Sequence, residues 1–257
     1  MNEQGYPILE EMRILRTEAL KSIRDRAFDM LPLYLHDYSD GVVSGCKLRA
    51  WENCLEVMPG IVKHQDYIYL LKEPMQVNYE ATEEYALLKL KFEKEKNKEG
   101  MMYRRMSIMI SPNPQIEADE LEICRFKLKS GAVLRTKYVD FLDYMTEFDT
   151  VNLIFTPASA PDKSSLLPEI TTAWAMEAKN YDLNEIDREF CLKALSKNVL
   201  TYDEIAFYIA WRLEIHFEDW DNLTLYNKLC QILKDIKAKG ERRCRNSSRS
   251  RREVYVD

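Results

Sequence analysis

The spacing of apolar residues changes twice along the 257-residue chain, and this change constrains the fold more than any other feature. Apolar residues recur at three- and four-residue steps over 3–31, at two-residue steps from Val42 to about Arg135, and at helical spacing again beyond 163. Helices and strands are therefore expected in separate stretches of the chain. This arrangement is typical of an α+β fold.

The predicted α+β fold has an N-terminal helix, an antiparallel β domain, a C-terminal helical bundle and a basic, disordered tail. We leave open whether the β domain is a meander, a sandwich or a partial barrel. Pro32 is expected to stop the first helix, Thr201 and Glu204 form a capping-box pattern, and the last helix is expected to end near Gly240. The predicted boundaries are 1–35 for the N-terminal helix, 38–135 for the β domain, 136–163 for a connector, 164–239 for the helical domain and 240–257 for the tail.

The connector contains four acidic residues within ten positions. Its aromatic residues Phe141, Tyr144 and Phe148 lie at helical spacing and predict a half-buried helix. A divalent-cation site needs converging oxygens, usually on glycine-shaped loops, and this segment has no glycine. A charged outer helix face is thus the favoured interpretation, and no metal site is predicted. The acidic residues are Asp140, Asp143, Glu147 and Asp149.

The common sequence signatures of catalysis are missing. The chain has no glycine-rich nucleotide fingerprint, no H-E-x-x-H and no G-x-S-x-G, and it contains only three histidines. No two of the six cysteines are three or four positions apart, so they are expected to be small buried residues in a reducing compartment. We therefore predict no enzymatic activity and no cofactor.

Neither a secretory signal nor a membrane span is predicted. The N-terminus lacks a basic-then-apolar profile, and no run approaches the roughly 20 apolar residues of a spanning helix. The chain is expected to be soluble and cytoplasmic when it is made.

The N-terminal helix carries an apolar stripe that must be covered. The candidate partner-facing residues are Ile8, Met12, Leu15 and Ile23. Either the protein's own core or a partner copy could cover this stripe.

Charge is concentrated at the C-terminal end. Residues 234–257 carry nine Lys or Arg and four Asp or Glu, and removing this +5 from the overall −6 leaves −11 for residues 1–233. An arginine cluster can bind nucleic acid through phosphate contacts, but no aromatic residue precedes Tyr255 to stack on bases. Docking on an acidic subunit is the other interpretation. The candidate contact residues are Arg242, Arg243, Arg245, Arg249, Arg251 and Arg252.

Residues 38–135 resemble a β element of phage tail and baseplate proteins. The resemblance rests on Gly-Val-Val-Ser-Gly at 41–45, the Val-Met-Pro-Gly turn at 57–60, the strand at 67–69 and a last strand at 120–128. The family's element usually has a glycine hairpin where this chain has His-Gln-Asp at 64–66. The whole chain also looks like uncharacterised proteins of Gram-positive gut bacteria that are encoded near phage-tail-like gene clusters.

The resemblance implies a structural subunit of a phage tail or a contractile injection apparatus, of the baseplate or fibre-adaptor kind. Such a protein contacts other subunits in a homo-oligomer or a hetero-assembly and becomes part of a phage-like particle. The alternative is an intracellular binding adaptor or regulator whose arginine-rich tail contacts nucleic acid.

Overall fold

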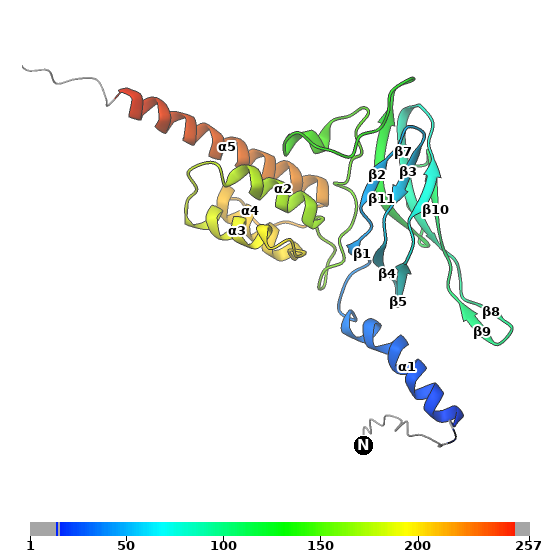
Figure 1. The fold of residues 1–257 in the computed structure, drawn as a ribbon. Coiled ribbons are helices and arrows are strands. Elements are labelled where there is room, and N and C mark those ends of the chain that lie inside the picture. Colours follow the sequence, from blue (N-terminus) through cyan, green and yellow to red (C-terminus); the bar gives the residue numbers. More distant parts are fainter. Residues whose placement is uncertain (1–13, 15, 250–257) are drawn as a thin grey trace, which may run out of the picture.

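The computed structural model describes residue 14 and residues 16–249, with helices at both ends of a set of antiparallel sheets (Figure 1). This arrangement confirms the α+β fold class. The helices are α1 (Thr17–Tyr34), the 3₁₀ helix η1 (Leu142–Met145), α2 (Pro168–Ala178), α3 (Glu185–Leu195), α4 (Tyr202–Leu213) and α5 (Asn222–Arg249). The strands are β1 (Gly41–Gly45), β2 (Leu48–Ala50), β3 (Cys54–Val57), β4 (Gly60–His64), β5 (Tyr67–Leu71), β6 (Met75–Asn78), β7 (Thr82–Phe92), β8 (Lys96–Lys98), β9 (Met101–Tyr103), β10 (Met106–Ser111) and β11 (Glu120–Leu128).

Within the described residues, the strands form three open three-stranded sheets and one hairpin, and they do not close into a barrel. The sheet orders are β1-β4-β5, β2-β3-β6 and β10-β7-β11, and β8 pairs with β9. A simple meander is also wrong, because β1 skips to β4 and β3 skips to β6. Aromatic packing joins two of the sheets: the ring of Phe92 on β7 stacks on His64 of β4 and contacts Tyr69 of β5.

Strand β7 is the buried centre of its sheet. It pairs with β10 on one side and β11 on the other, and residues 86–90 are all buried. Both faces of this strand are covered, so Lys89 has only 1% of its surface exposed. The Lys89 ammonium lies 3.0 Å from a carboxylate oxygen of Glu120 on β11 and also donates to the carbonyl of Gln115. An ion pair therefore lies within the hydrophobic core.

Two glycines allow β1 and β4 to pair closely. Gly45 has φ of +71°, and a Cβ there would lie 2.3 Å from the carbonyl oxygen of Pro59. A Cβ on Gly60, the register partner of Gly45, would lie 2.4 Å from the backbone nitrogen of Cys46. Both contacts are with main chain, which cannot turn aside as a side chain can. Close backbone packing therefore explains why glycine is needed at these two positions, which lie in the segments that resemble tail proteins.

Three helices of the bundle begin where local sequence rules predict. Pro168 starts α2, Asn184 caps α3 through the backbone N–H of Asp187, and Thr201 and Glu204 form the predicted capping box of α4. The ring of Trp174 is fully buried, and its indole N–H donates to the carbonyl of Leu229 on α5 (3.0 Å). Buried side chains of the sheets and the helices form one continuous hydrophobic core.

Three predicted helix limits are wrong. Pro32 lies inside α1, which continues to Tyr34, because proline lacks only its own N–H donor and the backbone N–H of Leu35 still donates to the carbonyl of Leu31. Helix α5 passes Gly240 and continues to Arg249, since the strong helix formers around the glycine offset its cost of roughly 1 kcal/mol. The connector forms only the 3₁₀ turn η1, because Phe148 pairs with Lys127 in a β-bridge and cannot remain helical. Residues 250–257 of the predicted disordered tail lie outside the described residues.

Candidate interaction surfaces

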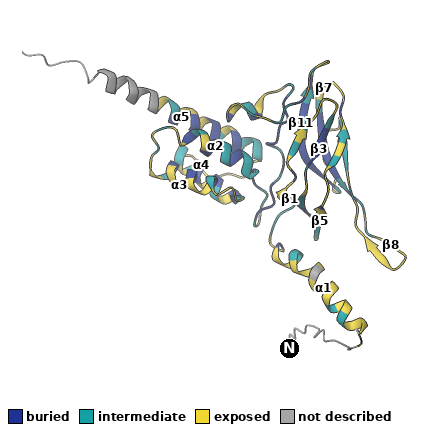
Figure 2. Ribbon diagram, in the orientation of Figure 1, coloured by how far each residue is buried: buried dark blue, intermediate teal, exposed yellow. Residues whose placement is uncertain are grey.

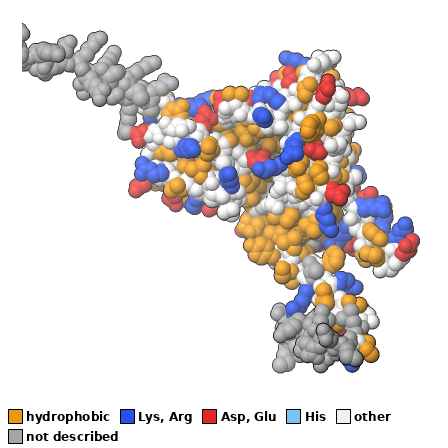
Figure 3. Space-filling model, viewed as in Figure 1, with side chains coloured by type: hydrophobic (Ala, Val, Ile, Leu, Met, Phe, Trp, Pro, Cys, Tyr) orange, Lys and Arg blue, Asp and Glu red, His pale blue; other side chains and the backbone are white. Residues whose placement is uncertain are grey.

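Helix α1 projects from the body and is exposed along most of its length (Figures 1 and 2). Leu20, Ile23, Met30 and Tyr34 follow one another at steps of three, seven and four residues, which is the a/d spacing of a coiled-coil seam. Between 44% and 75% of each residue is exposed. Figure 3 shows hydrophobic side chains gathered where α1 meets the body. The acidic residues Glu18, Asp25 and Asp29 lie on the opposite side of the helix.

The predicted partner-facing stripe is described only in part. Ile23 lies on the exposed apolar stripe of α1, whereas Ile8, Met12 and Leu15 lie outside the described residues. That this stripe faces a partner stays a prediction.

Two further apolar surfaces were not predicted from the sequence. Phe207 and Trp211, one turn apart on α4, are both exposed, and Met101 and Met102 are exposed on the hairpin β8–β9. Part of the signal for the α4 pair was present in the sequence, because Phe207 lies between buried positions of an amphipathic helix and Trp211 follows four residues later on the same face. Large exposed aromatic and methionine side chains are typical of surfaces that bind other proteins.

The predicted arginine cluster lies at the far end of the bundle. Arg242, Arg243, Arg245 and Arg249 are in the last turns of α5, beyond the buried Ile236. Arg251 and Arg252 lie outside the described residues. The role of this cluster stays a prediction.

A cleft of about 440 Å³ adjoins a polar cluster in the bundle. The buried carboxylate of Asp187 on α3 accepts hydrogen bonds from the hydroxyl of Tyr208 (2.8 Å) and the guanidinium of Arg212 (2.9 Å) on α4. Burial and the neighbouring Asp187 raise the pKa of Tyr208 well above its ordinary value. Because both side chains of α4 donate hydrogen bonds to Asp187 on α3, the cluster joins α3 to α4.

A larger cleft of about 670 Å³ lies between the sheets and the bundle. Its walls come from β1 and β2, the connector, α2 and the loop before α4. Lys47 and Glu169 lie on opposite walls, 3.6 Å apart between charged atoms. Lys197 has no ion-pair partner among the described residues.

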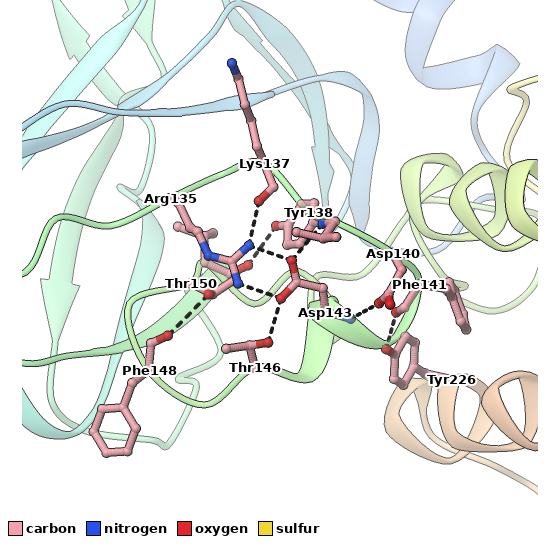
Figure 4. Close-up of polar contacts among 12 residues, drawn as sticks. Arg135, Lys137, Tyr138, Asp140, Phe141, Asp143, Thr146, Phe148, Thr150 and Tyr226 are labelled. Atoms are coloured by element: carbon pink, nitrogen blue, oxygen red, sulfur yellow. Dashed lines mark hydrogen bonds and ion pairs between the residues drawn. The ribbon is translucent and has the colours of Figure 1, made fainter.

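The connector is held by a polar network around Asp143 (Figure 4). Arg135 donates two hydrogen bonds of 2.5 Å to the two oxygens of Asp143, and Thr146 (2.6 Å) and the backbone N–H of Val139 (2.8 Å) add two more. The hydrogen bonds from Arg135 hold the pKa of Asp143 well below its usual range. The hydroxyl of Tyr226 on α5 donates to the carbonyl of Phe141, so this network lies where the bundle joins the sheets.

Replacing Asp143 by asparagine is expected to lower the free energy of unfolding by about 1–3 kcal/mol at pH 7, because the charge-assisted pair with Arg135 is lost. A lowered folded-state pKa contributes stability above the ordinary aspartate value of about 4, and this contribution falls as the pH drops below it. The difference between wild type and Asp143→Asn should therefore shrink between about pH 5 and pH 2. Urea unfolding across that range measures it.

Asp66→Asn is the matched control, because Asp66 is exposed and has no partner among the described residues. We expect it to change stability by less than about 0.5 kcal/mol at every pH. A deficit of Asp143→Asn that is the same at pH 7 and pH 3 would contradict the electrostatic explanation.

The other acidic residues of the connector have separate partners. Glu147 lies 2.8 Å from Lys127, Asp149 accepts from the backbone N–H of Lys129, and Asp140 accepts from the backbone N–H of Asp143. Within the described part of the chain, no group of three or more His, Cys, Asp or Glu is arranged to hold a metal ion. No described helix combines the length and hydropathy that crossing a membrane requires.

The cysteines whose side chains the structure describes are mostly buried, as predicted. Cys46, Cys124, Cys191 and Cys230 are buried and free, and Cys54 is half-buried and free. Burial raises the pKa of the Cys46, Cys191 and Cys230 thiols to about 11. At neutral pH these thiols are protonated, so they are poor nucleophiles.

No protein-family model matches the chain. No curated protein sequence matches it. Among solved structures, the chain is similar to one described as the crystal structure of TssK, with a TM-score of 0.38 and 8% sequence identity. The alignment covers 93% of this chain and 69% of that chain. A likeness at this TM-score and identity carries no argument about function.

Proposed function

We propose that this protein is a non-enzymatic assembly subunit that acts through contacts with other protein subunits. The projecting helix α1 carries the proposal, because its apolar stripe is exposed to solvent. Apolar helix faces of this kind are buried when a partner helix or groove covers them. The exposed aromatic residues of α4 and the methionines of the hairpin β8–β9 also suit a protein with several neighbours.

The assembly that we propose is a phage-tail-like or contractile-injection-like apparatus, in which this chain is a baseplate or fibre-adaptor component. The resemblance of residues 38–135 to tail proteins supports this finer proposal, and the close β1–β4 pairing explains its glycines. In this proposal the subunit is made in the cytoplasm and then becomes part of a phage-like particle.

Light scattering at low and high salt tests the proposal. We expect wild type to form a defined oligomer at both salt concentrations, because burial of apolar surface is not screened by ions. Replacing Ile23 and Met30 together by glutamate should weaken association at least about tenfold, since it places charge in the apolar contact. Both positions are exposed, so circular dichroism should show an intact fold.

The control combines Lys21→Glu with Asp29→Glu. It changes the net charge of the chain by the same −2 but lies away from the apolar stripe. We expect this variant to associate like wild type. A monomeric wild type at both salt concentrations would contradict the proposal and favour the adaptor whose arginine-rich tail binds nucleic acid. A titration with nucleic acid would then follow.

A further inference from the structure

The large cleft has an unpaired strand edge at its wall. Strand β2 is an edge strand, and its partner β3 lies on one side only. The bonds from Met58 N–H to the carbonyl of Lys47 (2.8 Å) and from Trp51 N–H to the carbonyl of Cys54 (2.9 Å) flank the paired region. By the alternation of an antiparallel ladder, the N–H and C=O groups of Leu48 and Ala50 therefore point away from β3. No described residue hydrogen-bonds these four groups.

Strand β1 is also an edge strand, and part of its free edge is already hydrogen-bonded to another segment of the chain. The backbone N–H of Val42 on β1 donates to the carbonyl of Pro157, and its carbonyl accepts from the N–H of Ser159. Residues 157–159 thus already pair with the edge of β1, but this pairing does not continue along β2. Leu48 lines the cleft, so its free backbone groups lie where a further strand could be added.

The sequence holds a segment whose chemistry fits this place. Residues 250–257 read Ser-Arg-Arg-Glu-Val-Tyr-Val-Asp, with three consecutive strong strand formers at 254–256. Glu253 and Asp257 flank these strand formers directly, and Arg251 and Arg252 before them make the segment neutral overall. The charged residues that line the cleft are Lys47, Lys197 and Glu169, so its lining has a net charge of +1. The exposed pair of Lys47 and Glu169 is weak enough to open for another carboxylate.

This segment cannot reach the cleft of its own chain. The side-chain amide of Asn222, in the first turn of α5, contacts the carbonyl of Thr156, which lines the cleft. Helix α5 then runs away from the sheets (Figure 1), and Arg249 lies about 40 Å further along its axis. An extended chain from Arg249 to Val254 spans at most about 18 Å.

We infer that the large cleft binds residues 250–257 of a second copy of this chain as a strand added to the free edge of β2. The contact is head-to-tail, so each copy offers one cleft and one C-terminal segment. This interface goes beyond the proposed function and is separate from the stripe of α1.

Peptide binding to the full-length chain tests the inference. The receptor carries Val254→Asp and Val256→Asp, which disable its own segment, and Ile23→Glu and Met30→Glu, which disable the α1 stripe. The probe is a fluorescein-labelled peptide of residues 250–257 with an amidated end. We expect saturable anisotropy at micromolar concentrations and no saturation by a peptide with the two valines changed to aspartate.

Two receptor changes locate the site. Lys47→Glu with Lys197→Glu, and separately Leu48→Pro, should each weaken binding at least about tenfold, and proline is tolerated on an edge strand. The matched control, Lys72→Glu with Lys239→Glu, changes charge equally outside the cleft and should bind like the parent receptor. Equal binding by the cleft variants, or no binding at ~1 mM peptide, would overturn the inference. Neither outcome bears on the oligomer built through α1, because every receptor lacks that stripe.

Discussion

Replacing Lys89 by methionine is expected to lower the free energy of unfolding by about 3–5 kcal/mol, because it leaves a buried carboxylate without its main partner. The side chain of Glu120 is 7% exposed, and its remaining cation, Lys91, is 3.7 Å away. Burial is the largest single effect and raises the pKa of Glu120. The hydrogen bonds from Lys89 and from the backbone N–H of Glu117, together with the charges of Lys89 and Lys91, lower it more, so the net pKa is below its ordinary value. Chemical denaturation at pH 7 measures the loss.

The pH dependence separates the charge effect from packing. In wild type the lowered pKa of Glu120 gives stability that is present above about pH 4 and decreases as the pH falls. In Lys89→Met the main partner that lowers the pKa of Glu120 is lost, so this pKa rises and protonation relieves the cost of burying the charge. The deficit should therefore shrink from pH 7 to pH 4. The double variant Lys89→Met, Glu120→Leu should regain most of the stability, and a double variant as unstable as the single one would contradict this account.

Gly45→Ala is expected to cost at least about 3 kcal/mol. The left-handed backbone at this position costs roughly 1–2 kcal/mol for a residue with a Cβ. The Cβ would also lie 2.3 Å from the carbonyl oxygen of Pro59, so β1 and β4 would have to separate. Thermal unfolding by circular dichroism measures the effect.

Gly131→Ala is the control for backbone strain alone. Gly131 has φ of +79°, close to that of Gly45, but its Cβ would meet nothing within 4 Å. We expect it to cost only about 1–2 kcal/mol. Equal losses for the two variants would mean that the close β1–β4 approach contributes nothing.

Local sequence rules predicted those elements whose cause is local. Alternation located β7, β10 and β11, and the capping box located the start of α4, because each signal lies within a few residues. The rules could not predict that Lys89 is buried, because alternation of apolar and polar residues is typical of a strand with one solvent-exposed face. A second covering layer depends on distant residues such as Gln115.

The connector and the interaction surfaces show the same limit. Phe148 has helical spacing from Tyr144, yet a bridge to Lys127, 21 residues earlier, extends it. Ile23 could be proposed as partner-facing because a stripe is visible in sequence. The large cleft could not be predicted from the sequence, because its walls come from β1, β2, the connector and α2, which only the tertiary fold brings together.

The length of α5 affects how two copies of the chain would be placed relative to each other. From Ile236, the last buried residue described, to Arg249 the helix continues for about 20 Å. The number of residues in this helix would thus determine both the distance and the rotation of a neighbour held through residues 250–257. Deleting four residues there would draw the neighbour in by ~6 Å and turn it by ~40°, whereas deleting seven would draw it in by ~10 Å and turn it by only ~20°.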